Sequence, residues 1–487
     1  MKTELLFSEK QGAPLPPCAE DVWQDLELER IAAAMAEGDP VIAEAVRDLL
    51  LRPLTDAQEL RQRQEVLRDG LRNADAVRGL YAVLCEALRG REKEQMWLSS
   101  ALPSSRFYGA VHLLQNYLHC LHQVRELVQR GQEQFSSAGF QELFAGIEAG
   151  LDDDFLRDAK ALLEELEFRD GTLIAGRLGR DLRVCGGRLV RRKAKKFDLR
   201  WTLAPACALA PQDDAGARDL SGRCELALWD SVDTLLRAAR QVEHWLLTLR
   251  RELAFLLGAV RLRSTMQQRG IPCCFPEPAS GGPARSFENL QDLSLALTIP
   301  QCVGNTLAGS ARLYIVTGAN QGGKTTFLRS VGQAQLMMQC GLCVAAERFS
   351  GPLCSGIFTH FGREEDEHLR SGKLDEELAR LDALIPLLHR DALLLCNESF
   401  SSTNEREGSE ICRQVTLALL EHGIEQLHVT HLYPFARYFS ELHREDVACL
   451  RAQWSEDGGR SFRILPGEPS QTAHGADLYR RIWHKEA

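Results

Sequence analysis

The chain has 487 residues, of which 44% are hydrophobic and 26% are charged, and this ordinary globular composition excludes a mostly disordered protein. The length exceeds what one hydrophobic core usually organises, so we expect more than one domain. The formal net charge of −10 means that nucleic-acid binding would have to rely on a local basic patch. Neither a membrane-length apolar run nor a secretion signal is apparent, so we expect a cytoplasmic protein that does not bind a membrane.

The first 265 or so residues have a helical pattern. Apolar residues recur at intervals of three and four, with few Gly or Pro between them, over residues 21–38, 39–50, 56–73, 107–131 and 231–262. Long helices with a wide apolar stripe pack on one another. We therefore expect a helical core or lever domain over residues 20–265, preceded by an N-terminal tail over residues 1–19.

Residues 171–203 interrupt this pattern with glycines and with ten cations against two acids. This interval predicts a strand-and-turn insertion with a phosphate-attracting surface. The alternative is a solvated loop that balances acidic helices nearby. The candidate nucleic-acid contacts are Arg188, Arg191, Arg192, Lys193, Lys195 and Lys196.

A stretch rich in Pro and Gly over residues 271–284 predicts a linker or irregular crossing, which we place within residues 266–300. Beyond it, short apolar strands alternate with helical patterns. This alternation predicts an α/β domain with a mostly parallel sheet over residues 301–487.

The strongest motif lies within residues 311–340. Gly318 is followed after four residues by Gly323, Lys324 and Thr325, which matches G-x-x-x-x-G-K-[ST] between an apolar strand and a helix. Glycines let backbone N–H groups turn toward phosphate oxygens, the lysine reaches the β- and γ-phosphates, and the threonine hydroxyl reaches Mg²⁺. We expect ATP and Mg²⁺ to bind here, at Gly318, Ala319, Asn320, Gln321, Gly322, Gly323, Lys324, Thr325 and Thr326.

A second apolar strand, DALLLCNES, ends at Asn397 and Glu398. In P-loop proteins the first of these positions usually holds an acid that binds Mg²⁺ through water, and the second polarises the attacking water. Asn397 keeps an oxygen but lacks the negative charge, so we expect weaker Mg²⁺ binding and slower turnover. A third strand, EQLHVTHLY, reaches His431, which can sense the γ-phosphate. The catalytic candidates are Lys324, Glu398 and His431.

The segments TGANQGGKTT, FTHFG, LLLCNES and HVTHLYPFA have the order and separations found in the MutS family of DNA mismatch-repair ATPases, which the chain resembles. The resemblance implies a P-loop NTPase domain of the ABC type, joined to an all-α lever domain with a small basic, clamp-like insertion. It implies a homodimer in which each nucleotide is completed by a loop of the other subunit. The loop candidate, residues 368–377, offers Ser371 and Gly372, but Leu374 to Glu376 replace the family's usual Ser-Thr-Phe run. Since the lever resemblance begins near residue 20, we expect no mismatch-reading domain.

We therefore expect a MutS-like ATPase that couples ATP binding and slow hydrolysis to the movement of helical levers. The expected ligand of the levers is double-stranded or branched DNA, read by shape and phosphate. The alternative is an ATP-gated scaffold that binds protein, scarcely hydrolyses ATP and never binds DNA. We do not expect a P-loop kinase, because the sequence contains no motif for the site of a phosphate acceptor.

Overall fold

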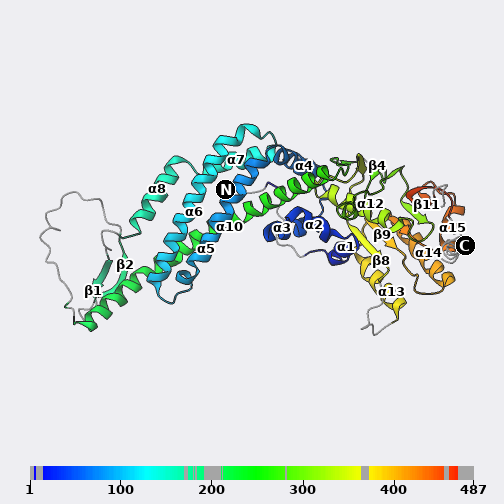
Figure 1. Ribbon diagram of the computed structural model, residues 1–487. Helices are drawn as coiled ribbons and strands as arrows, with labels where there is room; N and C mark the ends of the chain where they lie inside the picture. Colours follow the sequence, from blue (N-terminus) through cyan, green and yellow to red (C-terminus); the bar gives the residue numbers. More distant parts are fainter. Residues whose placement is uncertain are drawn as a thin grey trace, which may run out of the picture. The chain divides into compact units, whose positions relative to one another are not determined.

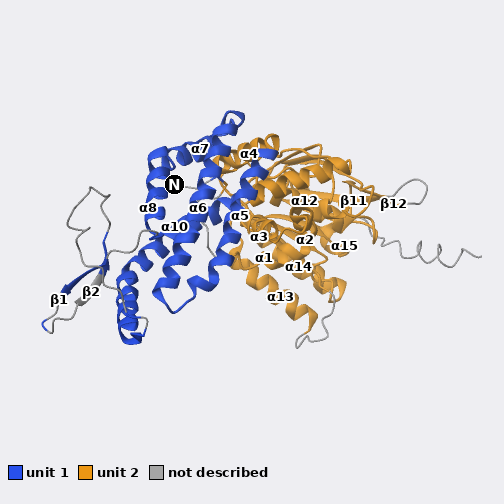
Figure 2. Ribbon diagram, turned by 60° about the vertical axis from the view of Figure 1, so that its left-hand side comes forward, with its two compact units in different colours: residues 1–5, 75–253 blue, residues 6–74, 254–487 orange. Residues whose placement is uncertain are grey.

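The computed structural model describes residues 5–6, 15–168, 174–178, 180, 184–190, 210, 212–279, 282–363, 372–454 and 460–469. The chain divides into two compact units, coloured separately in Figure 2. Unit 1 contains residues 1–5 and 75–253, and unit 2 contains residues 6–74 and 254–487. Among the described residues, no helix combines the length and apolar character that crossing a membrane requires.

Unit 1 is built from long helices, as the apolar periodicity of its sequence predicts. Phe107 and Val111 pack against Leu163, Leu228 and Val232, so that apolar stripes of three helices meet in one core. The helices of unit 1 (Figure 1) are α5 (Ala74–Leu98), α6 (Pro103–Gly131), α7 (Ala138–Gly150), α8 (Asp153–Glu165) and the greater part of α10 (Asp214–Gln268).

The basic interval of unit 1 contains two short antiparallel strands, β1 (Ile174–Leu178) and β2 (Val184–Leu189). A strand-and-turn insertion is what the sequence predicts there. Arg188 lies on β2 with an exposed side chain. The other five candidate nucleic-acid contacts lie outside the described residues, namely Arg191, Arg192, Lys193, Lys195 and Lys196.

Unit 2 opens with the helices α1 (Ala19–Asp25), α2 (Leu28–Ala36), α3 (Pro40–Leu50) and α4 (Ala57–Arg72). Aspartates begin two of them: Asp39 accepts from the backbone N–H of Val41 at 3.0 Å, and Asp56 accepts from that of Gln58 at 2.8 Å. The compact units group these helices with the strands, whereas the sequence suggests one helical domain over residues 20–265.

The main sheet in the described part of unit 2 has six strands in the order β12-β11-β6-β10-β9-β8. Neighbouring strands are parallel except β12, which runs antiparallel to β11. The expected α/β class with a mostly parallel sheet is thus observed. The strands are β6 (Leu313–Thr317), β8 (Ile357–Phe361), β9 (Leu393–Asn397), β10 (Glu425–Val429), β11 (Val447–Trp454) and β12 (Arg460–Pro466).

Helices cover both faces of this sheet. On one face, α12 (Lys324–Gln339) approaches β9 so closely that a Cβ on Gly332 would lie 2.5 Å from Leu395 Cδ1. On the other face, Leu313 and Ile315 pack against α13 (Lys373–Leu384), α14 (Glu405–Glu421) and α15 (Tyr433–Glu441). Because both faces are buried, the central strands are continuous apolar runs.

A second, mixed sheet has the order β3-β7-β4-β5. It is connected to the main sheet by Arg285, whose buried guanidinium donates to Glu425 of β10 at 2.8 Å. Residues 266–300, where the sequence predicts a linker, supply two of its strands and a short helix. Its strands are β3 (Glu277–Pro278), β4 (Arg285–Leu290), β5 (Asn305–Gly309) and β7 (Arg348–Gly351), and the helix is α11 (Leu293–Ala296).

Candidate functional site

Three adjacent parallel strands, β6, β10 and β9, end at the same edge of the main sheet. The glycine loop follows β6, Glu398 follows β9, and His431 lies two residues beyond the end of β10. Because the carboxyl ends of parallel strands lie together, three segments that are distant in sequence contribute to one site.

The glycine loop, residues 318–323, is shaped by positions that exclude side chains. Gly318 has a φ of 126° and Gly323 a φ of 88°, in a region that residues with a Cβ rarely adopt. A Cβ on Gly322 would lie 3.0 Å from both the Ala319 carbonyl oxygen and Ala452 Cβ. The loop therefore brings bare backbone to the N-terminus of α12, an arrangement that fits a phosphate group.

Lys324, the first residue of α12, folds its side chain back over the loop. Its Nζ donates to the carbonyl oxygens of Gly318 at 2.7 Å and Ala319 at 3.1 Å, and the residue is 4% exposed. Burial lowers the pKa of Lys324 to about 8, although the carboxylate of Glu398 opposes this shift. The ammonium group is thus held by the loop and is easier to deprotonate than an ordinary lysine.

Thr325 and Asn397 bring two neutral oxygens together. The Thr325 hydroxyl donates to Asn397 Oδ1 at 3.0 Å, which joins the first turn of α12 to the end of β9. Hydroxyl and amide oxygens are hard donors of the kind that Mg²⁺ accepts. Since neither group carries a charge, a cation held here would need negative charge from phosphate oxygens.

Glu398 and His431 form the charged part of the site. His431 Nε2 lies 2.9 Å from Glu398 Oε1, with the two side chains 31% and 40% exposed. The hydrogen bond from His431 lowers the pKa of Glu398 below its ordinary value; burial opposes this shift, and the charges of His431 and Lys324 add to it. Glu398 is thus an oriented carboxylate that is ionised at neutral pH.

Glu398, the glycine loop and the start of α12 border a cavity of about 340 Å³, at the lower end of the size range of small-molecule sites. Asn320 to Thr326 and Glu398 line its polar side. An opposite wall, for which the sequence offers no motif, is formed by Leu295, Ile299, Gln301, Cys302, Val303, Asn305 and Phe462. The second sheet contributes Asn305 of β5 to this wall, and the main sheet contributes Phe462 of β12.

The two remaining candidate residues from the sequence lie elsewhere. Gly372 directly precedes α13 and is not among the residues that line this cavity. Ser371 lies outside the described residues. The role of both as a contact for a second subunit stays a prediction.

Comparison with known proteins covers both units. The family model of the MutS2 N-terminal domain matches residues 55–269, and that of MutS domain V matches residues 314–468. The chain is 32% identical over 187 residues to Endonuclease MutS2 of Thermus thermophilus, a match that covers 38% of this chain and 25% of that relative. It is 31% identical over 181 residues to DNA mismatch repair protein MutS of Thermus aquaticus, covering 36% and 22%, and 31% identical over 133 residues to human MutS protein homolog 4, covering 26% and 14%.

The chain thus spans about a quarter or less of the length of these curated relatives. Their names include both an endonuclease and a DNA mismatch repair protein, so similarity to them does not assign one activity to this chain. The two family models nevertheless match in the expected order, one on the helical part and one on the sheet and glycine loop. The chain belongs to the MutS family.

Proposed function

We propose that this protein is a MutS-like P-loop ATPase that binds ATP at the glycine loop and hydrolyses it slowly. The observation that carries the proposal is that the glycine loop, Thr325 and Glu398 line one cavity, where Asn397 accepts from Thr325 and His431 pairs with Glu398. The backbone N–H groups of the loop and Lys324 would bind the phosphates. The apolar wall at Leu295, Ile299 and Val303 offers the opposite side of the cavity to the nucleoside.

Glu398 and His431 would carry the proton transfer. Glu398, kept ionised by His431, accepts a proton from a water molecule as the water oxygen attacks the γ-phosphorus, and the bond to the ADP oxygen breaks. Thr325 and Asn397 would hold Mg²⁺, which supplies positive charge to the phosphates when bound. Because Asn397 is neutral where an acid is usual, the protein should release the cation more readily and turn over more slowly.

Steady-state ATP hydrolysis of the wild type, Asn397→Asp and Glu398→Gln tests this assignment, with ATP binding measured separately. We expect Glu398→Gln to keep ATP binding and to lose hydrolysis about 100-fold or more, since it removes the general base. We expect Asn397→Asp to bind Mg²⁺ more tightly and to turn over faster. A wild type that fails to bind ATP at millimolar Mg²⁺ would contradict the proposal.

We further propose that unit 1 grips DNA and that two chains pair through their ATPase parts. Helix α10 contributes residues to both compact units, which supports a link between nucleotide binding and the helical part. The relatives, one named as an endonuclease and one as a DNA mismatch repair protein, support DNA as the ligand. ATP can move such an assembly only by binding one arrangement more tightly than another.

DNA binding is tested by neutralising Lys193, Lys195 and Lys196 and measuring affinity for linear and branched duplexes at several salt concentrations. Each lost phosphate contact should make the salt dependence shallower by roughly 0.9 in log–log slope. Neutralising Lys93 and Lys160, exposed lysines of α5 and α8, is the control, with two charges removed instead of three. Equal losses in both variants would argue against a specific basic surface.

A protein-binding scaffold is the second candidate. It is favoured by large apolar side chains exposed at the end of α5 and the start of α6, with Met96 72% and Trp97 46% exposed. Absence of DNA binding by the wild type at low salt, together with ATP-dependent binding of a protein, would support this candidate.

A further inference from the structure

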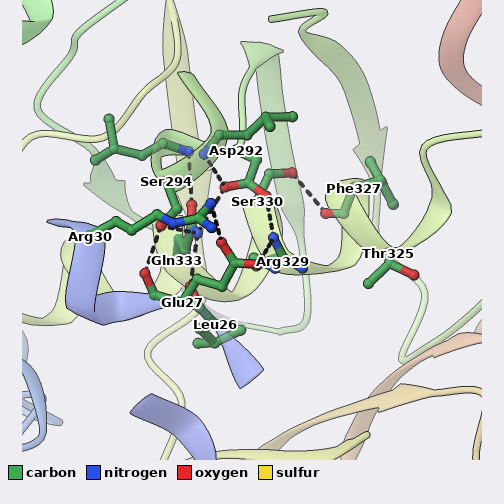
Figure 3. A network of polar contacts seen from close by, with 12 residues as sticks. Leu26, Glu27, Arg30, Asp292, Ser294, Thr325, Phe327, Arg329, Ser330 and Gln333 are labelled. Carbon is green, nitrogen blue, oxygen red and sulfur yellow. Dashed lines mark hydrogen bonds and ion pairs between the residues drawn. The ribbon is translucent and has the colours of Figure 1, made fainter. Parts of the chain in front are cut away.

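Asp292 lies three residues before Leu295, the first residue of the apolar wall, in a polar network with residues of α12, the helix that starts at Lys324 (Figure 3). Asp292 begins α11, because its side chain accepts from the backbone N–H of Leu295 at 3.2 Å. Leu295 itself lines the cavity, and Ile299 follows one turn later. The cap at Asp292 therefore orders the backbone at the start of the wall.

Gln333 of α12 makes the central contacts. The residue is 1% exposed, and its Oε1 accepts from the backbone N–H of Leu293 at 2.8 Å. Its Nε2, which has two hydrogens to donate, lies within hydrogen-bond distance of three oxygens: Asp292 Oδ1 at 2.9 Å, the Leu26 carbonyl at 2.9 Å and Ser294 Oγ at 3.1 Å. One buried amide thus connects the start of the wall to the junction between α1 and α2.

That junction is itself tied to the wall. Glu27 has a φ of 49°, and its carbonyl oxygen accepts from Ser294 Oγ at 2.8 Å. Arg329 of α12 lies 2.7 Å from Glu27 Oε1 and 3.4 Å from Asp292 Oδ2, so one cation serves two carboxylates. Burial raises the pKa of Asp292, and the charge of Arg329 is the first influence that opposes this shift.

The backbone of α12 allows the junction to come this close. A Cβ on Gly332 would lie 2.7 Å from Leu26 Cδ2 and 2.5 Å from Leu395 Cδ1, so Leu26 packs directly against the helix. Three segments that are remote in sequence therefore converge on α12. Buried polar groups are costly to leave unpaired, so the network favours a single position of residues 292–295.

We propose that Gln333 is a positioning residue that holds the apolar wall of the cavity and thereby sets the affinity for the nucleoside part of the nucleotide. This inference rests on the proposed function, because it presupposes that the triphosphate lies on the glycine loop. Without the amide, residues 292–303 would have to be ordered on binding, and that cost would appear as weaker affinity. The phosphates, held by the loop and Lys324, would be unaffected.

The test compares Gln333→Leu with Gln339→Leu. Gln339 is a matched control because it is also a buried glutamine of α12, and its Nε2 donates to the Leu54 and Cys354 carbonyls at 2.8 and 2.9 Å. Titration calorimetry would measure binding of Mg²⁺–ATP and of inorganic tripolyphosphate, which has no nucleoside. We expect Gln333→Leu to bind ATP about tenfold more weakly and tripolyphosphate within about twofold of the wild type.

Amide hydrogen exchange in the nucleotide-free proteins gives a readout that does not depend on binding. We expect faster exchange over residues 292–303 in Gln333→Leu and not in Gln339→Leu. If Gln333→Leu does not fold, Ser294→Ala, which removes only the hydroxyl between Gln333 and Glu27, should shift both measurements in the same direction by a smaller amount.

Several results would overturn the inference. ATP and tripolyphosphate could weaken equally in Gln333→Leu, the control Gln339→Leu could lose the same affinity for ATP, or exchange over residues 292–303 could stay at the wild-type rate. If the wild type binds neither ligand, the proposed nucleotide function is wrong, and the proposed role of Gln333 in nucleotide affinity is wrong as a consequence. A wild type that binds both ligands, with unchanged ATP affinity in Gln333→Leu, would overturn the role of Gln333 alone.

Discussion

Under the proposed function, the pKa of Lys324 should make ATP affinity depend on pH in a range where most lysines do not titrate. Burial lowers this pKa to about 8 in the nucleotide-free protein, and bound phosphates would raise it because they stabilise the ammonium. Affinity should therefore be nearly complete at pH 7 and fall as the pH rises through 8. With this pKa, about nine in ten molecules are charged at pH 7 and about one in ten at pH 9, so the dissociation constant should rise about tenfold, or about 1.4 kcal/mol.

Titration calorimetry with Mg²⁺–ATP at pH 7, 8 and 9 measures this change. Lys324→Arg is the control, because a guanidinium stays charged over the whole range. We expect the arginine variant to bind more weakly at pH 7 but with a flat pH dependence. A flat profile in the wild type, or an equal slope in Lys324→Arg, would refute the assignment of the titration to Lys324.

Two further predictions concern stability and use urea unfolding. Arg285→Met should lower the free energy of unfolding by about 3–5 kcal/mol, because it leaves Glu425 as a buried unpaired charge. The control is Arg437→Met, which removes an exposed ion pair and should change the free energy of unfolding little. Similar losses in the two variants would contradict the reasoning. Burial lowers the pKa of His360 from 6.5 to about 4. The buried neutral ring therefore contributes stability that is complete above pH 6.5 and is lost as the pH falls toward 4. The free energy of unfolding should fall over this range by up to about 1.4 kcal/mol per pH unit. His360→Gln should reduce this slope by about one proton, and an unchanged slope would exclude His360 as its source.

Local sequence was sufficient to predict the parts of the fold that depend on neighbouring residues. Gly318 and Gly323 have positive φ where the motif requires a turn, and Lys324 begins a helix, since backbone freedom and helix initiation are local properties. The apolar run that ends at Asn397 forms β9, and every residue of this strand except the last is buried. The helix-rich part and the α/β part of the chain were predictable from the spacing of apolar residues along the sequence.

Long-range packing decided the rest. Asp292, Gln333 and Leu26 carry no motif, and the amide of Gln333 meets its partners only because α12 packs between β9 and the α1–α2 junction. The pairing of Glu398 with His431 likewise depends on the adjacency of β9 and β10. Residues of the glycine loop could be named from the sequence because backbone geometry selects them. The opposite wall and its support could not, because a buried hydrogen bond between distant segments depends on where the whole chain brings its atoms, and local residue preferences do not record that.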